Sequence, residues 1–218
     1  MRYELRDLIA QGRPEGVAEI AAQSRRVLGK LVALTYDPDP DVAWGAVRAM
    51  GVAAARVADD DPDFVRQHLR RLHWLLQEES GGVCWHAPEA MAEIVARRSD
   101  LFEDYVPIVV HLMLETAAED LEHFRAGMLW AVGRLGGLAA SVVADVLPGI
   151  EAALDHPDPQ VRGTAAWCLG RLGRTAALAD RPELLADSDE CALYEDGALH
   201  TLTVGRLVGA ALGVEPQP

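Results

Sequence analysis

Cysteine is scarce in this sequence, and its three residues, Cys84, Cys168 and Cys191, are an odd number at wide spacing. Such spacing suits neither a disulfide framework nor a Cys-x-x-Cys metal site, so we expect reduced, structural thiols. Long apolar runs are also missing, and charged residues stand at the N-terminus where a secretory signal would need its apolar core. These absences predict a cytoplasmic protein that does not span a membrane.

A positive net charge is missing as well. Lys and Arg number 20 against 34 Asp and Glu, which leaves a formal net charge of −14, and this averaged field repels nucleic acids and anionic membrane surfaces. The densest basic pairs, Arg25-Arg26, Arg70-Arg71 and Arg97-Arg98, lie among acidic residues. The sequence therefore argues against nucleic acid and membranes as partners, and it favours neutral or basic ones.

Aromatic residues make up only 6% of the chain, whereas half of all residues are apolar and a quarter are charged. Alanine and leucine dominate the apolar fraction, and both favour helices. A length of 218 residues fits one domain or one short repeat array, and it can bury a sizeable core. We expect an all-α fold.

A Pro-Asp-Pro turn occurs twice, at 38–40 and at 157–159. Proline disrupts a helix interior but is allowed at the first helical position, so one helix ends before each turn and the next begins at its second proline. A small residue closes each expected second helix, at Gly51, Ala92, Gly133, Gly170 and Gly205. The separations of 41, 41, 37 and 35 residues are typical of HEAT or armadillo arrays.

The segment 146–173 carries the fullest pattern: Leu-Pro before an apolar run, Asp-x-Pro-Asp-Pro-x-Val-Arg, and Ala-Ala-x-x-Leu-Gly-x-Leu-Gly. Together these motifs resemble the HEAT-repeat consensus, including its phycobilisome-lyase-like subgroup. The stretch 79–90, Glu-Ser-Gly-Gly followed by Trp and Ala-Pro-Glu-Ala, resembles small HEAT-repeat proteins of sulfate-reducing bacteria, a group with no established activity. The resemblance implies an α-solenoid of about five helical hairpins with an N-terminal capping helix at 3–12.

The resemblance also gives expected boundaries. The chain would form a single HEAT-repeat domain, 1–218, with repeats at approximately 24–57, 62–98, 103–137, 141–173 and 174–212. The last repeat is degenerate, and its two expected helices are 175–186 and 194–212.

Each expected second helix has a core stripe of three positions four residues apart, which together span about 80° of the helix surface. The stripe comprises Val42, Ala46 and Met50; Val83, Ala87 and Met91; Phe124, Met128 and Val132; and Val161, Ala165 and Leu169. Four tryptophans lie opposite it, on the side where a solenoid receives partners, or else they fill gaps between adjacent repeats. The fifth, Trp74, lies among leucines of a first helix, and we expect it in the core.

Polar residues near these tryptophans complete a candidate partner-binding set. Its members are Trp44, Arg48, Trp85, His86, Glu89, Trp130, Arg134, Trp167 and Arg171. No catalytic set accompanies it, because Ser80 lacks a Gly-x-Ser-x-Gly setting and Cys84 beside His86 lacks a third group to orient the pair. The main hypothesis is a non-enzymatic interaction module that binds a protein or peptide in its concave groove, without a cofactor.

The segment 78–93 leaves an alternative open. His86, Glu89 and Glu93 have the spacing of one helical face and Cys84 is near, but a His at a helix start is more often a capping or packing residue, so we expect no metal. The repeat pattern also resembles the lyases that attach bilins to phycobiliproteins. The alternative function is therefore a small-molecule or tetrapyrrole-binding, lyase-like protein with a site around Trp85, His86 and Glu89.

Overall fold

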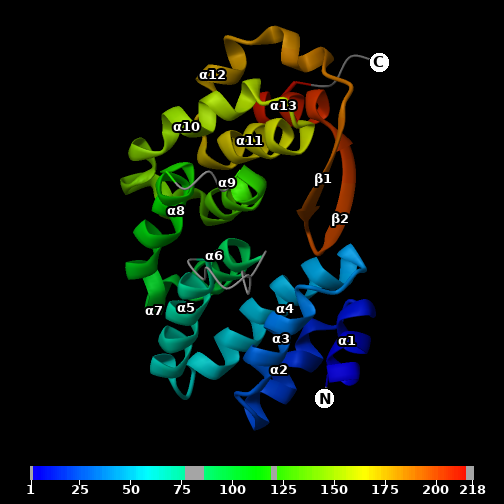
Figure 1. Cartoon of the computed structure of the whole chain (residues 1–218), viewed down its shortest axis with the longest axis vertical. Coiled ribbons are helices and arrows are strands. Elements are labelled where there is room, and N and C mark those ends of the chain that lie inside the picture. Colours follow the sequence, from blue (N-terminus) through cyan, green and yellow to red (C-terminus); the bar gives the residue numbers. More distant parts are fainter. Residues whose placement is uncertain (1, 77–85, 119–121, 215–218) are drawn as a thin grey trace. The chain divides into compact units, whose positions relative to one another are not determined.

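The computed structural model describes residues 2–76, 86–118 and 122–214, and most of its regular structure is helical (Figure 1). The chain forms two compact units, which we call unit 1 (Met1–Tyr105 and Tyr194–Leu199) and unit 2 (Val106–Leu193 and His200–Pro218). Successive helices pack against one another within each unit. The predicted helical-repeat fold is confirmed, and the single-domain boundary 1–218 stays a prediction.

Unit 1 contains two helical hairpins preceded by two further helices. Their elements are α1 (Arg2–Ala10), α2 (Pro14–Gln23), α3 (Val27–Leu34), α4 (Pro40–Ala58), α5 (Pro62–Leu76), α6 (Ala87–Arg97), α7 (Ser99–Phe102) and the 3-10 turn η1 (Glu103–Tyr105). Helix α1 is the predicted capping helix. Helix α2 was not predicted, although Gly12, with φ +65°, and Pro14 supply a helix stop and a helix start.

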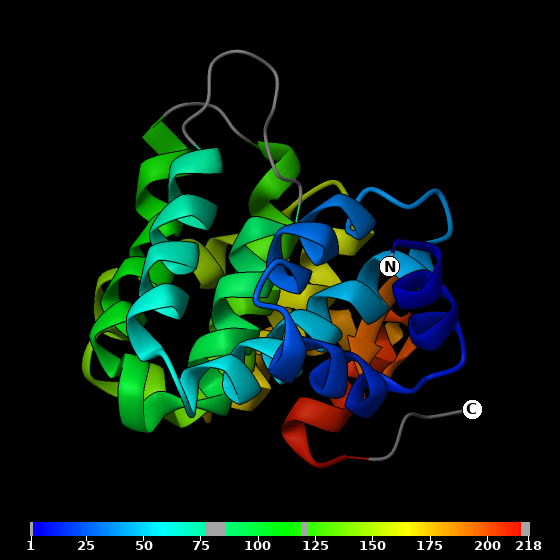
Figure 2. The ribbon, with the colours of Figure 1, turned by 90° about the horizontal axis from the view of Figure 1, so that it is seen from below.

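Helix α4 is the central element of unit 1. It packs against α1, α2, α3, α5 and α6, and Figure 2 shows the blue and cyan helices layered around it. The helix starts at Pro40 because Asp39 caps it, its carboxylate accepting a hydrogen bond from the Asp41 amide. Gly51 lets α6 approach closely, since a Cβ there would lie 2.6 Å from Glu93 Cγ.

Unit 2 contains the remaining helices and one two-stranded sheet. Its elements are α8 (Val106–Ala118), η2 (Glu122–Phe124), α9 (Arg125–Leu135), η3 (Gly136–Ser141), η4 (Val143–Asp145), α10 (Leu147–Ala152), η5 (Ala153–Asp155), α11 (Pro159–Leu172), α12 (Ala176–Ala179), η6 (Pro182–Ala186), β1 (Glu190–Glu195), β2 (Ala198–Thr203) and α13 (Val204–Leu212). The turn between the strands groups with unit 1.

The degenerate last repeat differs from its prediction. The predicted helix over 194–212 is wrong, because residues 190–203 form a β-hairpin and only residues 204–212 are helical. Asp196 and Gly197 adopt φ of +51° and +86° at the turn, and Asp-Gly is the residue pair that such tight hairpins favour. Strand β1 is anchored to α11, since the Gln160 side chain donates to the Ala192 carbonyl oxygen (2.7 Å) and accepts from its amide (2.8 Å).

The predicted core stripe is confirmed wherever the structure describes it, because each of those side chains is buried. Val83 lies outside the described residues. The prediction for Trp74 is wrong, since this side chain is 56% exposed. Helix α5 turns Leu69, Leu72 and Leu76 inward, and a residue two positions after Leu72 points about 200° away from it. None of the described helices combines the length and apolarity needed to cross a bilayer.

Candidate binding site

Helix α4 carries the first two residues of the candidate set on one face. The opposite face of α4 is buried, because it carries Val42, Ala46 and Met50. Trp44 and Arg48, one turn apart, therefore point away from the core. Both side chains are half-buried. The capped start of α4 therefore fixes where these two functional candidates stand.

The ring of Trp44 lies between two other aromatic side chains. It stacks on Tyr194 with ring centroids 5.3 Å apart and an interplanar angle of 10°, and it meets His86 edge-on at 4.9 Å and 62°. Tyr194 is not in the predicted set, because its place here depends on the β-hairpin, for which Asp196-Gly197 is the available sequence signal. We call Trp44, His86, Glu89 and Tyr194 the Trp44 cluster.

His86 and Glu89 form a pair at the start of α6. His86 Nδ1 and Glu89 Oε1 are 3.1 Å apart, and Glu89 is only 2% exposed. Burial alone lowers the pKa of His86, but the charge of Glu89 and their hydrogen bond outweigh burial and raise that pKa above its ordinary value. The second oxygen, Glu89 Oε2, is buried without a hydrogen-bond partner among the described residues.

Further polar groups surround the cluster on unit 1. Glu93 Oε1 accepts a hydrogen bond from Arg97 Nε at 2.9 Å. The Tyr194 hydroxyl bonds to Arg48; burial raises the pKa of Tyr194, and Arg48 acts in the opposite direction. Within the part of the chain that the structure describes, the cluster thus combines aromatic surface with an acidic group, Glu89, that lacks a full set of hydrogen-bond donors.

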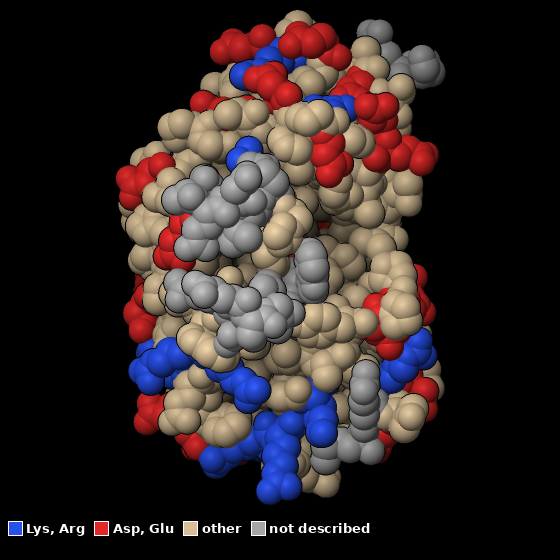
Figure 3. Space-filling model, in the orientation of Figure 1, with Lys and Arg blue, Asp and Glu red and all other residues tan. Residues whose placement is uncertain are grey.

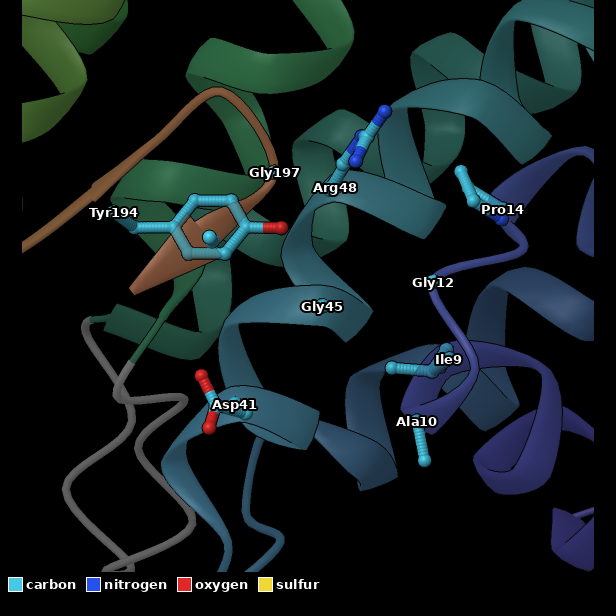
Figure 4. A pocket seen from close by; sticks show the side chains of 10 residues that line it. Ile9, Ala10, Gly12, Pro14, Asp41, Gly45, Arg48, Tyr194 and Gly197 are labelled. Atoms are coloured by element: carbon cyan, nitrogen blue, oxygen red, sulfur yellow. The ribbon is translucent and has the colours of Figure 1, made fainter. Parts of the chain in front are cut away.

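A pocket of about 250 Å³ opens beside the cluster, within unit 1 (Figure 4). It is lined by Ile9, Ala10, Gly12, Pro14, Asp41, Gly45, Arg48, Tyr194, Gly197 and Ala198. Glycine is favoured at the hairpin turn because Gly197 has φ +86°, and the Arg48 guanidinium lies against the backbone of this residue. Tyr194 and Arg48 therefore belong both to the surroundings of the cluster and to the pocket wall.

The tryptophans of unit 2 have a different environment. Trp130 and Trp167 are 5% and 9% exposed, and their rings stack with centroids 6.1 Å apart at 11°. Gly133 lies directly under the Trp167 ring, where any side chain would collide with it. The pair fills the contact between α9 and α11, as the alternative of packing between adjacent repeats predicts. The prediction that both rings line an open surface is wrong, because the neighbouring helix covers them.

The other predicted members are spread more widely. Arg171 is exposed and its guanidinium lies 6.0 Å from the Trp167 ring centroid, whereas Arg134 is half-buried. Trp85 lies outside the described residues. The structure therefore brings together Trp44, Arg48, His86 and Glu89 in unit 1, and Trp130, Arg134, Trp167 and Arg171 belong to unit 2.

A metal site around His86 has little support in the geometry. Glu93 pairs with Arg97, and no group of three or more potential ligands exists among the residues that the structure describes. Cys84 lies outside them. The two cysteines inside them, Cys168 and Cys191, are buried free thiols, and burial raises the pKa of the Cys191 thiol to about 11, which makes it a poor nucleophile.

Charge is unevenly distributed on the face shown in Figure 3. Lys and Arg side chains gather over α3 and α5 of unit 1, and Asp and Glu side chains gather around α12 and β1 of unit 2. Net charge alone therefore does not predict which sign of ligand a given surface attracts, so a binding experiment needs peptides of both signs.

Comparison with known proteins supports the repeat architecture. Residues 122–172 match the family described as HEAT-like repeat. A protein of Archaeoglobus fulgidus, described only as an uncharacterized protein, is 30% identical over 119 residues, which are 55% of this chain and 57% of that protein. The match thus spans little more than half the length of this relative, which is archaeal, so the bacterial affinity stays a prediction.

Two solved structures resemble this one. A designed armadillo repeat protein in complex with the peptide (KR)4 is 18% identical and has a TM-score of 0.52. The match covers 96% of this chain and 98% of the designed protein. A HEAT-like repeats protein from Thermococcus onnurineus NA1 is 17% identical and has a TM-score of 0.41. That match covers 98% of this chain and 79% of the Thermococcus protein. The first likeness supports an armadillo- or HEAT-type solenoid, a fold typical of protein-interaction scaffolds.

Proposed function

We propose that this protein is a non-enzymatic interaction module that binds a basic segment of a protein or peptide partner at the Trp44 cluster. The single observation that carries the proposal is Glu89 Oε2, a buried carboxylate oxygen with no hydrogen-bond partner among the described residues. It lies in a carboxylate that already engages His86 through its other oxygen. The proposed ligand is a lysine or arginine side chain.

A buried oxygen that lacks a hydrogen bond is destabilising, so binding of a ligand that donates one is favoured. A buried acceptor left without a hydrogen bond costs about 1–3 kcal/mol, and more when it is charged. An ammonium or guanidinium group that reaches Glu89 would supply a charge-assisted hydrogen bond, which is roughly twice as strong as a neutral one. A neutral donor would recover only part of that free energy, so the site should select cations.

The aromatic members supply the remaining contact surface. The half-buried Trp44 ring is held in place by Tyr194 and His86, so it would lose little conformational entropy when a partner covers it. The methylene stem of a lysine or arginine side chain packs well on such a surface. Tryptophan is also among the residues that most often dominate interface energetics.

The net charge and the fold agree with this choice. A formal charge of −14 favours a basic partner on average, and the designed armadillo repeat protein that resembles this chain was solved with the peptide (KR)4. That likeness extends to the fold alone, but the peptide offers a suitable probe. Nucleic acid and membranes are not partners in this proposal, and the protein acts in the cytoplasm, where its buried thiols stay reduced.

The test is a titration with fluorescently labelled (KR)4, monitored by fluorescence anisotropy. Wild-type protein should bind this peptide and should bind neither an alternating Asp-Glu peptide nor a Ser-Asn peptide of equal length. Glu89→Gln removes the charge and should weaken binding at least about tenfold. The matched control is Glu103→Gln, which makes the same change at an exposed position of unit 1 and should change affinity less than about twofold.

Melting temperatures separate binding from folding. If Glu89→Gln is poorly folded, Trp44→Phe replaces it, because phenylalanine keeps the stack on Tyr194 while it reduces the exposed ring surface. Equal affinity of wild type and Glu89→Gln for (KR)4, with both proteins folded, would overturn the proposal. Stronger binding of the acidic peptide would instead assign the interaction to the basic surface over α3 and α5.

In this proposal, unit 2 contributes only secondary contacts to the partner. Arg134 and Arg171 remain candidates for contact with a partner, since Arg171 is exposed beside Trp167. Trp130 and Trp167 would then act by holding α9 and α11 together. Alanine variants of the two arginines should leave (KR)4 binding unchanged if the basic segment is bound by unit 1 alone.

A further inference from the structure

Arg48 lines the pocket beside α4 without an acidic partner among the described residues. Arg56 on the same helix, in contrast, pairs with Asp60. The Arg48 guanidinium carries five N–H groups, and the Tyr194 hydroxyl accepts a hydrogen bond from it. The side chain is half-buried, which reduces its contact with water. A carboxylate in the pocket would therefore find donors in the planar arrangement that suits it.

The nearby acidic groups do not prevent an anion from binding beside Arg48. Asp41 also lines the pocket, but it stands seven residues earlier on α4, about 10 Å away along the helix axis. Figure 4 shows the Arg48 side chain directed away from Asp41. Glu93 acts on the Tyr194 hydroxyl, yet its charge is compensated by the ion pair with Arg97. The pocket thus has a basic end at Arg48 and an acidic end at Asp41.

The rest of the pocket wall is mostly apolar. Ile9 and Ala10 at the end of α1, Pro14 at the start of α2, and Ala198 in β2 contribute aliphatic surface. The volume of about 250 Å³ is below the usual range of drug-sized sites. A pocket of this size suits one amino-acid residue with an aliphatic side chain, and it does not suit a longer stretch of chain.

The pocket is close enough to the Trp44 cluster for one short segment to reach both. Trp44 and Arg48 are one turn apart on α4, which is about 6 Å along the axis. Tyr194 stacks on Trp44 and bonds to Arg48, so it joins the two places directly. An extended peptide advances about 3.3 Å per residue. A residue that enters the pocket would therefore follow, by about two positions, the residue that covers Trp44.

We propose that the basic segment bound at the Trp44 cluster is the C-terminal tail of its partner, with its terminal carboxylate on Arg48 and an aliphatic last side chain in the pocket. This inference rests on the proposed function and adds the kind of segment that is recognised. A terminal carboxylate comes after the basic residues, so it lies at the basic end of the pocket. An acidic side chain within the segment would instead bring its charge near Glu89 and Asp41, which repel it.

Three peptides test this proposal by fluorescence anisotropy with the full chain. Each carries its label at the N-terminus: (KR)4-Leu with a free C-terminal carboxylate, (KR)4-Leu with a C-terminal amide, and (KR)4-Asp with a C-terminal amide. Wild type should bind the free acid at least about tenfold more tightly than the leucine amide, because only the acid offers Arg48 a charge-assisted hydrogen bond. The aspartate amide should bind at least about fivefold more weakly than the free acid, because it lacks the aliphatic side chain.

A variant assigns the preference to one residue. Arg48→Gln should bind the free acid and the leucine amide with equal affinity, both near the wild-type value for the amide. The matched control is Arg56→Gln, which removes the same charge two turns further along α4, where Arg56 pairs with Asp59 and Asp60. This control should keep the tenfold preference for the free acid. The comparison of the peptides on wild type needs no variant, so it remains decisive if Arg48→Gln is poorly folded.

The outcomes separate this inference from the proposed function. Equal affinity of wild type for the free acid and the leucine amide would overturn the inference and leave binding of a basic segment intact. So would a preference for the acid that survives in folded Arg48→Gln, or an aspartate amide that binds as tightly as the acid. If the preference holds but Glu89→Gln weakens neither peptide, the role of Glu89 is wrong and the terminal site stands. Failure of wild type to bind any of the three would overturn both.

Discussion

Trp44 and Tyr194 stand 150 positions apart in the sequence, yet their rings stack face to face with centroids 5.3 Å apart. One ring comes from the first repeat and the other from the β-hairpin near the end of the chain. The contact ties the hairpin turn to α4, and it holds the Trp44 ring at the place where we propose that a partner binds.

The stack makes a prediction about stability. Tyr194 is 6% exposed, so Tyr194→Ala should lower the free energy of unfolding by about 3 kcal/mol, as other buried aromatic truncations do. Tyr194→Phe keeps the stacked ring and loses only the hydroxyl that bonds to Arg48, which should cost about 1 kcal/mol. Urea denaturation measures both, and equal losses for the two variants would mean that the ring contact contributes nothing.

A second prediction separates the two tryptophan environments. Trp167→Ala should lower the free energy of unfolding by about 3–5 kcal/mol because its ring is buried against Gly133 and Trp130. Trp74→Ala removes the same side chain from an exposed position and should change stability by no more than about 0.5 kcal/mol. Thermal melts of the two variants provide the comparison, and similar destabilisation would contradict these placements.

Burial of His68 predicts a pH dependence of stability. Its side chain is 8% exposed, Nε2 has no hydrogen-bond partner among the described residues, and burial, with a smaller contribution from Arg71, lowers its pKa to about 4. The unfolded chain, with a His pKa of about 6.5, therefore takes up a proton that the folded protein refuses. Stability should fall as the pH drops from about 6.5 to 4, by about 3 kcal/mol at most.

The control for this effect is His68→Leu, which fills a similar volume without a titrating group. Chemical denaturation at pH 5 and at pH 8 should show that the variant gains more over wild type at pH 5. If the difference between wild type and variant is the same at both pH values, His68 does not have the lowered pKa that its burial implies.

The raised pKa of His86 predicts how partner binding depends on pH. A protonated His86 neutralises part of the charge of Glu89, 3.1 Å away, and so competes with a basic ligand. Loss of that proton restores the negative potential, so the affinity for (KR)4 should increase as the pH rises through the raised pKa. His86→Gln should abolish this dependence in anisotropy titrations from pH 6 to pH 9, and an affinity that falls with rising pH would contradict the arrangement.

Local sequence signals explain why most of the fold could be predicted. The Pro-Asp-Pro turns fix the starts of α4 and α11, and a capping aspartate stands before each helix in the structure. The core stripe followed from helical periodicity, since alanines such as Ala46 and Ala165 are fully buried in the contact between helices. These features depend on residues close together in the chain.

The candidate site was only partly predictable. The helix face predicts Trp44, His86 and Glu89. Tyr194 instead comes from a β-hairpin where the sequence predicts a helix, and it contacts Trp44 from far along the chain. The direction of a helix face does not say whether a neighbour covers it. Trp130 and Trp167 are therefore buried although the sequence places them, like Trp44, on the helix face opposite the core stripe. Packing between repeats decides that question.

The most direct test of the proposed function is a double-mutant cycle between Glu89 and the peptide. Wild type and Glu89→Gln are each titrated with (KR)4 and with peptides in which one basic residue at a time is replaced by norleucine or citrulline, which keep the side-chain length without the charge. We predict that one position shows a coupling free energy of at least about 1.5 kcal/mol with Glu89, while the others add independently. Coupling within about 0.3 kcal/mol of zero at every position, in folded proteins that bind the peptide, would contradict the claim that Glu89 receives a basic side chain of the partner.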